Sequence, residues 1–138
     1  MKIRTYQASD EADVINLWVK CGLVVPWNNP HQDIERKLKV HPELFLVGTR
    51  DDEVIASVMG GYEGHRGWIN YLAVDPAYRR RGYGQKMMTA VKVKLKAMGC
   101  PRINLQVRSS NASVIRFYEA IGYKQDDVVS FGRRLVED

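Results

Sequence analysis

Cysteine and histidine are scarce in this sequence, which argues against disulfide and metal chemistry. Its 138 residues contain two cysteines and three histidines. Cys21 and Cys100 are too few and too far apart for a disulfide framework or a metal-binding pattern. His31, His41 and His65 fall in different predicted elements and lack the spacing of zinc ligands. We therefore expect two buried thiols and no metal.

Long apolar runs are also missing. The N-terminal region carries charges at Lys2, Arg4, Asp10, Glu11 and Asp13, so it lacks the apolar core of a signal peptide. No other segment approaches the roughly 20 apolar residues that are needed to cross a bilayer. We therefore expect a cytoplasmic protein that does not enter the membrane.

Charge of one sign is only slightly in excess. Lysine and arginine number 21 against 16 for aspartate and glutamate, a net charge of +5, which favours anionic ligands without identifying one. A nucleic-acid-binding domain is possible on charge alone. However, the cations are dispersed, and their one dense cluster, Arg79 to Arg81, has no interleaved aromatic residues on which bases could stack. A nucleotide-like cofactor fits the sequence better than a polymer does.

The composition that remains suits one compact α/β domain, residues 1–138. Hydrophobic residues make up 45% of the chain, which is enough to fill a core. β-rich segments and segments with apolar residues at helical spacing follow one another along the chain. Strands are predicted at residues 3–6, 44–49, 54–60, 68–74, 103–107, 123–129 and 130–136, and helices at residues 10–20, 31–40, 85–98 and 111–122.

Pairing rules arrange these segments into a mixed, mostly antiparallel sheet with about four helices. The second and third predicted strands flank a polar turn and form a hairpin. Helix 85–98 joins strand 68–74 to strand 103–107, so this connection is a parallel, right-handed crossover. The last two predicted strands form a final antiparallel pair.

The most informative segment is Arg79-Arg80-Arg81-Gly82-Tyr83-Gly84, which lies between a predicted strand and a predicted helix. The first N–H groups of a helix have no acceptor within it, and the helix dipole adds roughly half a positive charge there. Glycine lacks the Cβ that would keep a diphosphate away, so the segment predicts a phosphate site. It has neither the Gly-Lys-Ser/Thr ending of a P-loop nor the third glycine of a Rossmann motif.

Three motifs together resemble the GNAT superfamily of acyl-CoA N-acyltransferases. They are Leu72-Ala73-Val74-Asp75-Pro76, Arg79-x-x-Gly82-x-Gly84 and Asn111-x-x-x-x-x-Phe117-Tyr118-Glu119-x-x-Gly122-Tyr123. The stretches Pro26-Trp27-Asn28, Gly60-Gly61-Tyr62 and Gly132-Arg133-Arg134-Leu135 are similar to the YpeA-type group of bacterial acetyltransferases. The resemblance covers most of the chain and implies a single GNAT-like domain in which the parallel pair of strands is splayed.

This resemblance also implies acetyl-CoA as the acyl-donor co-substrate. The backbone of residues 72–74 would pair with the pantetheine arm as if the cofactor were an added strand, and the backbone of residues 81–84 would hold the pyrophosphate. The arginines would add long-range charge, and Asn111 would contact pantetheine, cap its helix, or do both. The implied cofactor-binding residues are Leu72, Ala73, Val74, Arg79, Arg80, Arg81, Gly82, Tyr83, Gly84 and Asn111.

By the same resemblance, Tyr118 is the general acid that protonates the departing thiolate. A phenol with a pKa of about 10 is protonated at neutral pH and can make this donation. Asn111 and Tyr118 are seven residues apart. They would therefore share one helix face, roughly 10 Å apart along the axis, where both could meet one extended cofactor. The alternative is that Tyr118 only packs in the core.

The general base is harder to identify. Residues 105–111 resemble the strand of ribosomal-protein N-terminal acetyltransferases, where a glutamate occupies the position of Gln106. An amide cannot accept a proton, so neither base catalysis from this position nor that group's peptide specificity follows. Glu63 is our candidate for the base, with His65 as the alternative, acting directly or through water.

These features predict an acetyl-CoA-dependent N-acetyltransferase in which a primary amine attacks the thioester directly. Trp27 either lines the acceptor site or fills the core. The amine acceptor, small molecule or protein, is not identified by the sequence, and the C-terminal strands offer a contact for a homodimer. Two other functions fit part of the pattern: a non-catalytic acyl-CoA-binding regulatory domain, and a small basic nucleic-acid-binding domain.

Overall fold

The computed structural model describes residues 1–138 and divides them into two units, residues 1–105 and residues 106–138. The first unit contains the sheet and three α-helices, and the second contains the last α-helix and the C-terminal segment. None of the helices is both long enough and apolar enough to span a membrane.

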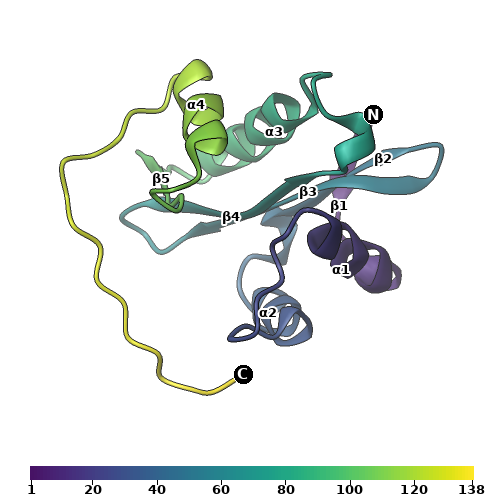
Figure 1. Ribbon diagram of the computed structural model, residues 1–138, viewed down its shortest axis with the longest axis horizontal. Coiled ribbons are helices and arrows are strands. Elements are labelled where there is room, and N and C mark those ends of the chain that lie inside the picture. Colours follow the sequence, from purple (N-terminus) through teal and green to yellow (C-terminus); the bar gives the residue numbers. More distant parts are fainter. The chain divides into compact units, whose positions relative to one another are not determined.

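The first unit is built on a five-stranded sheet (Figure 1). Its strands, in chain and spatial order, are β1 (Lys2–Thr5), β2 (Phe45–Arg50), β3 (Glu53–Tyr62), β4 (Gly67–Val74) and β5 (Ile103–Leu105). Neighbouring strands from β1 to β4 pair antiparallel, whereas β4 and β5 pair parallel. The predicted mixed, mostly antiparallel sheet is therefore confirmed.

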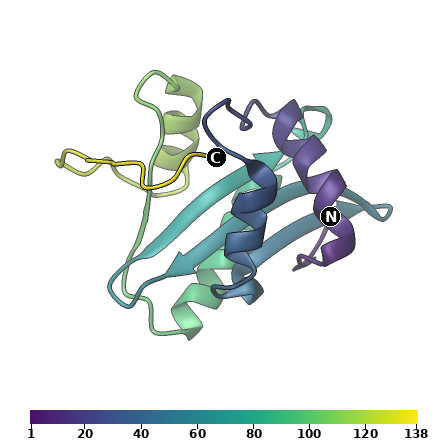
Figure 2. The same cartoon turned by 90° about the horizontal axis from the view of Figure 1, so that it is seen from below.

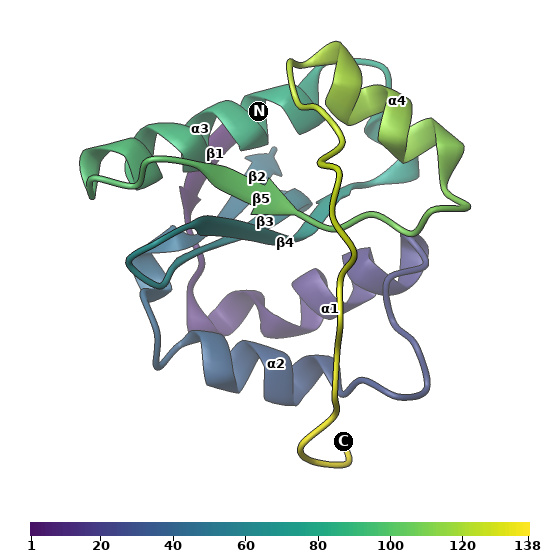
Figure 3. The same ribbon diagram turned by 90° about the vertical axis from the view of Figure 1, so that its left-hand side faces the viewer.

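Helices cover both faces of this sheet. α1 (Glu11–Lys20) and α2 (Pro30–Lys37) lie on one face, and α3 (Tyr83–Ala97) lies on the other (Figure 3). Seen from below, α1 and α2 lie next to each other across the strands (Figure 2). α3 connects β4 to β5, as the crossover prediction requires, and begins at Tyr83 rather than at residue 85.

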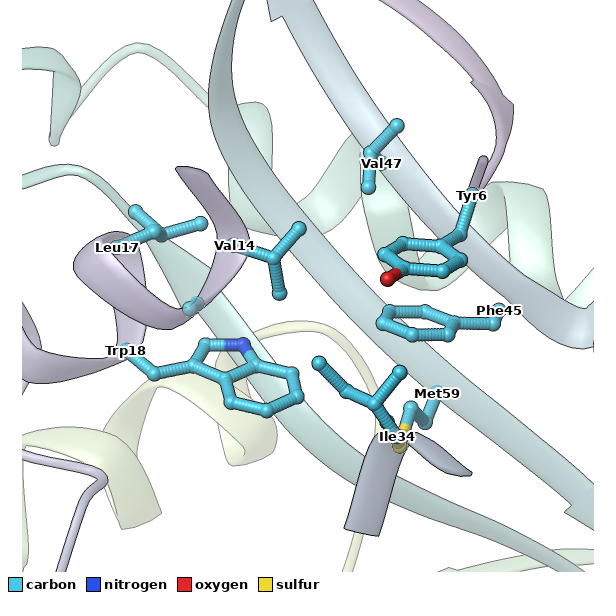
Figure 4. Close-up of a cluster of buried hydrophobic side chains, with 9 residues drawn as sticks. Tyr6, Val14, Leu17, Trp18, Ile34, Phe45, Val47 and Met59 are labelled. Carbon is cyan, nitrogen blue, oxygen red and sulfur yellow. The ribbon is translucent and has the colours of Figure 1, made fainter. Parts of the chain in front are cut away.

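Large apolar side chains fill the space between the sheet and the first two helices (Figure 4). Val14, Leu17 and Trp18 project from α1 and are at most 2% exposed. The rings of Tyr6 and Phe45 stack with centroids 4.3 Å apart. Burying one such side chain stabilises the fold by about 1.5–3 kcal/mol, so this cluster fixes α1 against the strands.

On the other face, α3 approaches the sheet closely because two strand positions lack a side chain. Its predicted apolar stripe is buried and consists of Met87, Met88, Val91 and Leu95. A Cβ on Gly60 of β3 would lie 2.5 Å from Val91 Cγ2 of α3. A Cβ on Gly67 of β4 would lie 3.3 Å from Leu95 Cδ1 of α3 and 2.8 Å from Sγ of Cys100, which follows the helix. A contact of 2.5 Å does not occur between real atoms, so the observed packing of α3 requires glycine at position 60, and a side chain at position 67 would force its neighbours to shift.

The second unit contains α4 (Ala112–Ala120) and no strand. The predicted antiparallel pair at residues 123–129 and 130–136 is therefore wrong. A hairpin needs turn residues between its strands, and Val129-Ser130-Phe131 supplies none of the strong ones. Several apolar side chains of this segment are largely exposed, among them Phe131 at 94% and Leu135 at 89%.

We predict that Gly60→Ala destabilises the protein by about 1–3 kcal/mol, because the added methyl group forces Val91 and α3 away from the sheet. The neighbouring Gly61→Ala is the matched control, since nothing lies within 4 Å of a Cβ at that position. Urea denaturation of both variants measures the difference. Equal midpoints would show that the close approach of α3 does not depend on Gly60.

Candidate active site

The pairing of the parallel strands covers only the first part of β4. β5 pairs with β4 only where Gly67 to Ile69 lie opposite Ile103 to Leu105. β4 continues to Val74, and its last residues pair with β3 alone. Within residues 1–105, no strand covers the β5 side of residues 70–74, which we call the open edge of β4. Backbone groups at such an edge are available to a ligand that binds as an extra strand.

The hydrogen-bond alternation of β4 shows which backbone groups face the open edge. Asp75 N–H donates to Ile55 O at 2.8 Å, and Ala73 lies opposite Ser57. Residues 73 and 75 therefore direct their backbone groups to β3, whereas Leu72 and Val74 direct theirs to the open edge. Val74 O already accepts hydrogen bonds from Arg79 Nε and Cys21 Sγ, both at 3.3 Å. Leu72 is thus the residue of this edge whose N–H and carbonyl both remain available in the first unit, whereas Val74 offers only its N–H.

A β-bulge precedes Leu72. The pairing of β3 with β4 shifts between Ser57 and Met59, so that Val58 faces both Tyr71 and Leu72. Tyr71 has a φ of 53°, a left-handed conformation that is uncommon for a bulky side chain. Such a conformation costs about 1–3 kcal/mol and persists only where its surroundings impose it.

Three contacts from other elements impose this conformation on Tyr71. Its ring stacks on Trp18 of α1 with centroids 3.8 Å apart. Its hydroxyl donates to Asp33 Oδ2 of α2 at 2.6 Å, and its carbonyl accepts from Ser57 Oγ of β3 at 2.8 Å. The Ser57 hydroxyl in turn accepts from Trp18 Nε1 at 2.9 Å. These residues gave no motif in the sequence, because their relation appears only when helix and strands pack together.

The N-terminus of α3 is the predicted phosphate site. Gly82 is the N-cap, with φ 76° and ψ 12°, and no side chain caps the helix. The first intrahelical bond runs from Lys86 N to Gly82 O at 3.1 Å, so the N–H groups of residues 83–85 have no acceptor within the helix. No acidic residue lies in the first turn, and a Cβ on Gly82 would meet nothing within 4 Å. This end of α3 is therefore open and suited to an anion.

The predicted arginines surround this helix end without forming ion pairs. Arg79 is held by its bond to Val74 O, the guanidinium of Arg81 lies 5.2 Å from the centroid of the Tyr78 ring, and Arg80 has a φ of 65°. None of the three forms an ion pair, although the charge of Asp75 acts on Arg79, so most of their charge remains available to attract an anion.

Two further cations at this site were missed by the sequence reasoning. Arg50, at the end of β2, donates to Tyr83 Oη at 3.3 Å and lies 5.6 Å from the Tyr78 ring centroid. Lys86 Nζ lies 5.5 Å from the Tyr83 ring centroid. Arg50 is distant in the chain, and only the three-dimensional packing brings it to α3. Both residues increase the positive potential around Gly82.

Glu63 lies away from the open edge. It belongs to the hairpin that joins β3 to β4, and its carboxylate accepts hydrogen bonds from the N–H groups of His65 and Arg66. The Arg66 bond first, and then the His65 bond, lower the pKa of Glu63, which makes it a weaker base. From Gly67 to Leu72 the strand extends roughly 15 Å at its usual rise per residue. The structure therefore places Glu63 and His65 toward the far end of β4 from Leu72, so that either residue would act as the base through intervening water.

In the second unit, α4 carries the other predicted site residues. Asn111 Oδ1 accepts from Val114 N at 3.4 Å, so the side chain caps the helix. Tyr118 is 9% exposed, and the rings of Phe117 and Tyr123 lie edge-on to it, with centroids 5.0 and 5.8 Å away. Burial, and then the charge of Tyr123, raise the pKa of Tyr118 to about 12. The phenol is therefore protonated at neutral pH, as an acid must be.

Gln106 also lies in the second unit. Its Nε2 donates to Ser130 Oγ at 2.5 Å, which holds the amide against the C-terminal segment. This contact gives Gln106 a structural role. Its side chain is an amide, so it cannot accept a proton as a base would.

Known proteins match this chain over most of its length. Residues 11–123 match the family model described as Acetyltransferase (GNAT) family. An acetyltransferase of Sodalis glossinidius is 50% identical over 139 residues, which cover 100% of this chain and 98% of that protein.

Solved structures share the fold at low identity. The ribosomal-protein-S18-alanine N-acetyltransferase from Escherichia coli has a TM-score of 0.74 at 20% identity, covering 91% of this chain and 78% of that one. AAC(6')-Iy, in complex with the bisubstrate analogue CoA-S-monomethyl-acetylneamine, has a TM-score of 0.79 at 17% identity, covering 98% of both chains. Because the family model matches well over half of the sequence, the chain belongs to the acetyltransferase (GNAT) family.

Proposed function

We propose that this acetyl-CoA-dependent N-acetyltransferase holds its co-substrate between the open edge of β4 and the N-terminus of α3. The observation that carries the proposal is the glycine-capped, uncompensated start of α3, which directly follows the unpaired end of β4. The N–H groups of residues 82–85 would bind the pyrophosphate. The pantetheine amides would pair with the backbone of Leu72, while Val74 and Ala73 shape the edge beside it.

Positive charge in this arrangement comes from Arg79, Arg80 and Arg81. Backbone N–H groups come from Tyr83 and Gly84. Arg50 and Lys86 strengthen the same field. Five cations around a helix end without acidic residues suit a ligand with several phosphate groups better than they suit a single carboxylate. The proposed coenzyme has such a set of phosphates.

The chemistry requires a neutral amine, a donor to the carbonyl oxygen and a proton for the thiolate. The amine nitrogen attacks the thioester carbon, and the Leu72 N–H donates to the oxygen as it gains charge. The C–S bond then breaks, and the Tyr118 hydroxyl gives its proton to sulfur. The attacking nitrogen gives its extra proton to water, and water passes a proton to the Tyr118 phenolate, which becomes a phenol again. Asn111 orients the pantetheine while it caps α4.

The acceptor is a primary amine, either on a small molecule or on a protein. Trp27 belongs to the loop that connects α1 to α2, and its side chain is 53% exposed, so it does not fill the core. We propose that it forms part of the acceptor wall. We also propose a cytoplasmic location, where acetyl-CoA is used and where Cys21 and Cys100, both free and only half-buried, would stay reduced.

A second copy of this chain is the proposed protein partner. The C-terminal segment exposes Val128, Val129, Phe131, Leu135 and Val136, at 57–94% each. Each such side chain offers on the order of 100 Å² of apolar surface, so a segment pair could supply much of the roughly 800 Å² per partner that stable interfaces bury. Isolated exposed apolar residues need no such explanation, but five within a short segment do.

We predict that Gly82→Val raises the Kd of acetyl-CoA about tenfold or more, because its side chain enters the space that a phosphate must occupy. Gly99→Val is the matched control. Gly99 also has a positive φ and open space around it, but it lies at the other end of α3, so it introduces similar backbone strain without touching the phosphate. Isothermal titration calorimetry measures both. Wild-type affinity in Gly82→Val would contradict the phosphate assignment.

We predict that Tyr118→Phe lowers kcat by about 10²–10⁴ while leaving the Kd of acetyl-CoA within about threefold. Thiol release from acetyl-CoA across a panel of primary amines measures turnover. Tyr123→Phe, which alters a neighbouring ring in the same way, should retain kcat. Since the pKa of Tyr118 is about 12, the phenol stays protonated between pH 7 and about pH 10, so deprotonation of Tyr118 should not lower kcat in this range. Unchanged turnover in Tyr118→Phe removes the residue from the mechanism, and no release from any amine would favour a binding-only domain.

We predict that the wild-type chain is a dimer by light scattering and that Phe131→Asp with Leu135→Asp converts it to a monomer. A charge at either position is costly to bury in an apolar interface. Val19→Asp is the control, because Val19 is also exposed, at 58%, but belongs to α1 rather than to the C-terminal segment. A monomeric wild-type chain would contradict the proposed contact.

A further inference from the structure

The bulge at Tyr71 changes which residues of β4 face outward from β3. Before the bulge, Gly67 N–H points toward β5 and donates to Arg102 O at 2.7 Å. By alternation, Ile69 also faces β5. After the bulge, Leu72 and Val74 face that side instead, because Ala73 rather than Leu72 lies opposite Ser57. Because of the one extra residue, odd-numbered residues of β4 direct their backbone groups to this side before the bulge, and even-numbered residues do so after it.

Without the bulge, the catalytic amide would point the wrong way. Continued regular pairing from the Met59 and Asn70 pair would place Leu72 opposite Ser57. The Leu72 N–H would then be directed to β3 and engaged in the sheet. The N–H group proposed to stabilise the thioester oxygen is exposed at the edge only because Tyr71 is left-handed.

Ser57 connects the bulge to the core. Its side chain is fully buried, and its hydroxyl accepts from Trp18 Nε1 and donates to Tyr71 O. Both hydrogen-bonding roles of the hydroxyl are thus occupied. Asp33 acts on the other end of Tyr71, where its carboxylate accepts from the phenol and from Arg36 at 3.3 Å. The carbonyl and the side chain of Tyr71 are therefore held by two different elements.

We propose that Ser57 and Asp33 are positioning residues for acetyl transfer. They act through Tyr71, whose left-handed backbone turns the Leu72 N–H toward the thioester carbonyl at the open edge. The inference rests on the proposed function in one respect, namely that acetyl-CoA lies along this edge. It assigns a role in the reaction to residues of β3 and α2 that do not touch the coenzyme.

The main test is Ser57→Ala, which removes the hydroxyl and leaves both Trp18 Nε1 and Tyr71 O without a partner. We expect kcat to fall by roughly tenfold to a hundredfold, because a misplaced donor loses much of its effect on the transition state. The Kd of CoA, which has no acetyl group, should change less than about twofold. This division between turnover and binding distinguishes positioning from a general loss of structure.

Val47→Ala is the matched control. Val47 is fully buried on β2 within the same core cluster and lies directly opposite Ser57, but its apolar side chain has no group that could hydrogen-bond to Tyr71 or Trp18. We expect it to lower the melting temperature as Ser57→Ala does, yet to keep kcat within about twofold at a temperature where both variants are folded. Equal losses of kcat in the two variants would overturn the proposed role of Ser57.

A second measurement does not depend on turnover. In ¹⁵N NMR spectra, the Leu72 amide of the wild-type chain should shift more with acetyl-CoA than with CoA, and Ser57→Ala should abolish that difference. If no shift occurs in the wild type, the proposed coenzyme site itself fails. If the wild type shifts and Ser57→Ala shifts equally, the site stands and the positioning role is overturned.

Variants at the phenol serve if Ser57→Ala does not fold. Tyr71→Phe removes the bond to Asp33 and keeps the ring stacked on Trp18, so we expect a lower kcat with unchanged CoA affinity. Asp33→Asn keeps an oxygen acceptor for the phenol and should retain most activity. If Asp33→Asn instead abolishes turnover while Tyr71→Phe does not, Asp33 acts through its charge, and its positioning role is overturned.

Discussion

The left-handed conformation of Tyr71 is the constraint on which the candidate active site depends. It shifts the register of β4 by one residue and brings the backbone of Leu72 to the open edge. Stacking on Trp18, a hydrogen bond to Asp33 and a hydrogen bond from Ser57 all stabilise it. The core beneath α1 and α2 therefore has a second role besides stability, because it determines which backbone amide of β4 faces the open edge, where we propose that the coenzyme binds.

The same layered arrangement connects the bulge to the phosphate site. β4 ends at Val74, and α3 begins at Tyr83, packed closely against Gly60 on the opposite face of the sheet. The loop between them is held by Asp75, which accepts from Ala77 N at 2.9 Å and pairs with Lys20 of α1 at 3.3 Å. The Ala77 bond, more than the ion pair, keeps the pKa of Asp75 below its usual range. Both ends of the proposed coenzyme site are thus formed by backbone that side chains position.

The sequence predicted the parts of this site that are local. Arg79 to Gly84 lie at the start of a helix, and strand 68–74, helix 85–98 and strand 103–107 form a parallel crossover. These features follow from periodicity, glycine and spacing. The bulge at Tyr71 could not be predicted, because no glycine marks it and three distant residues impose it. Arg50 was missed for the same reason. Glu63 was proposed from its place just before the central strand, and the structure puts its hairpin at the far end of β4 from Leu72.

A crystal structure with bound acetyl-CoA tests the central claim most directly. We expect pyrophosphate oxygens within about 3 Å of N–H groups in residues 82–85, and the thioester oxygen at a similar distance from Leu72 N. Tyr71 should keep its positive φ in that complex. A coenzyme bound away from this edge, or a regular β4 in which the Leu72 N–H pairs with β3, would contradict the account.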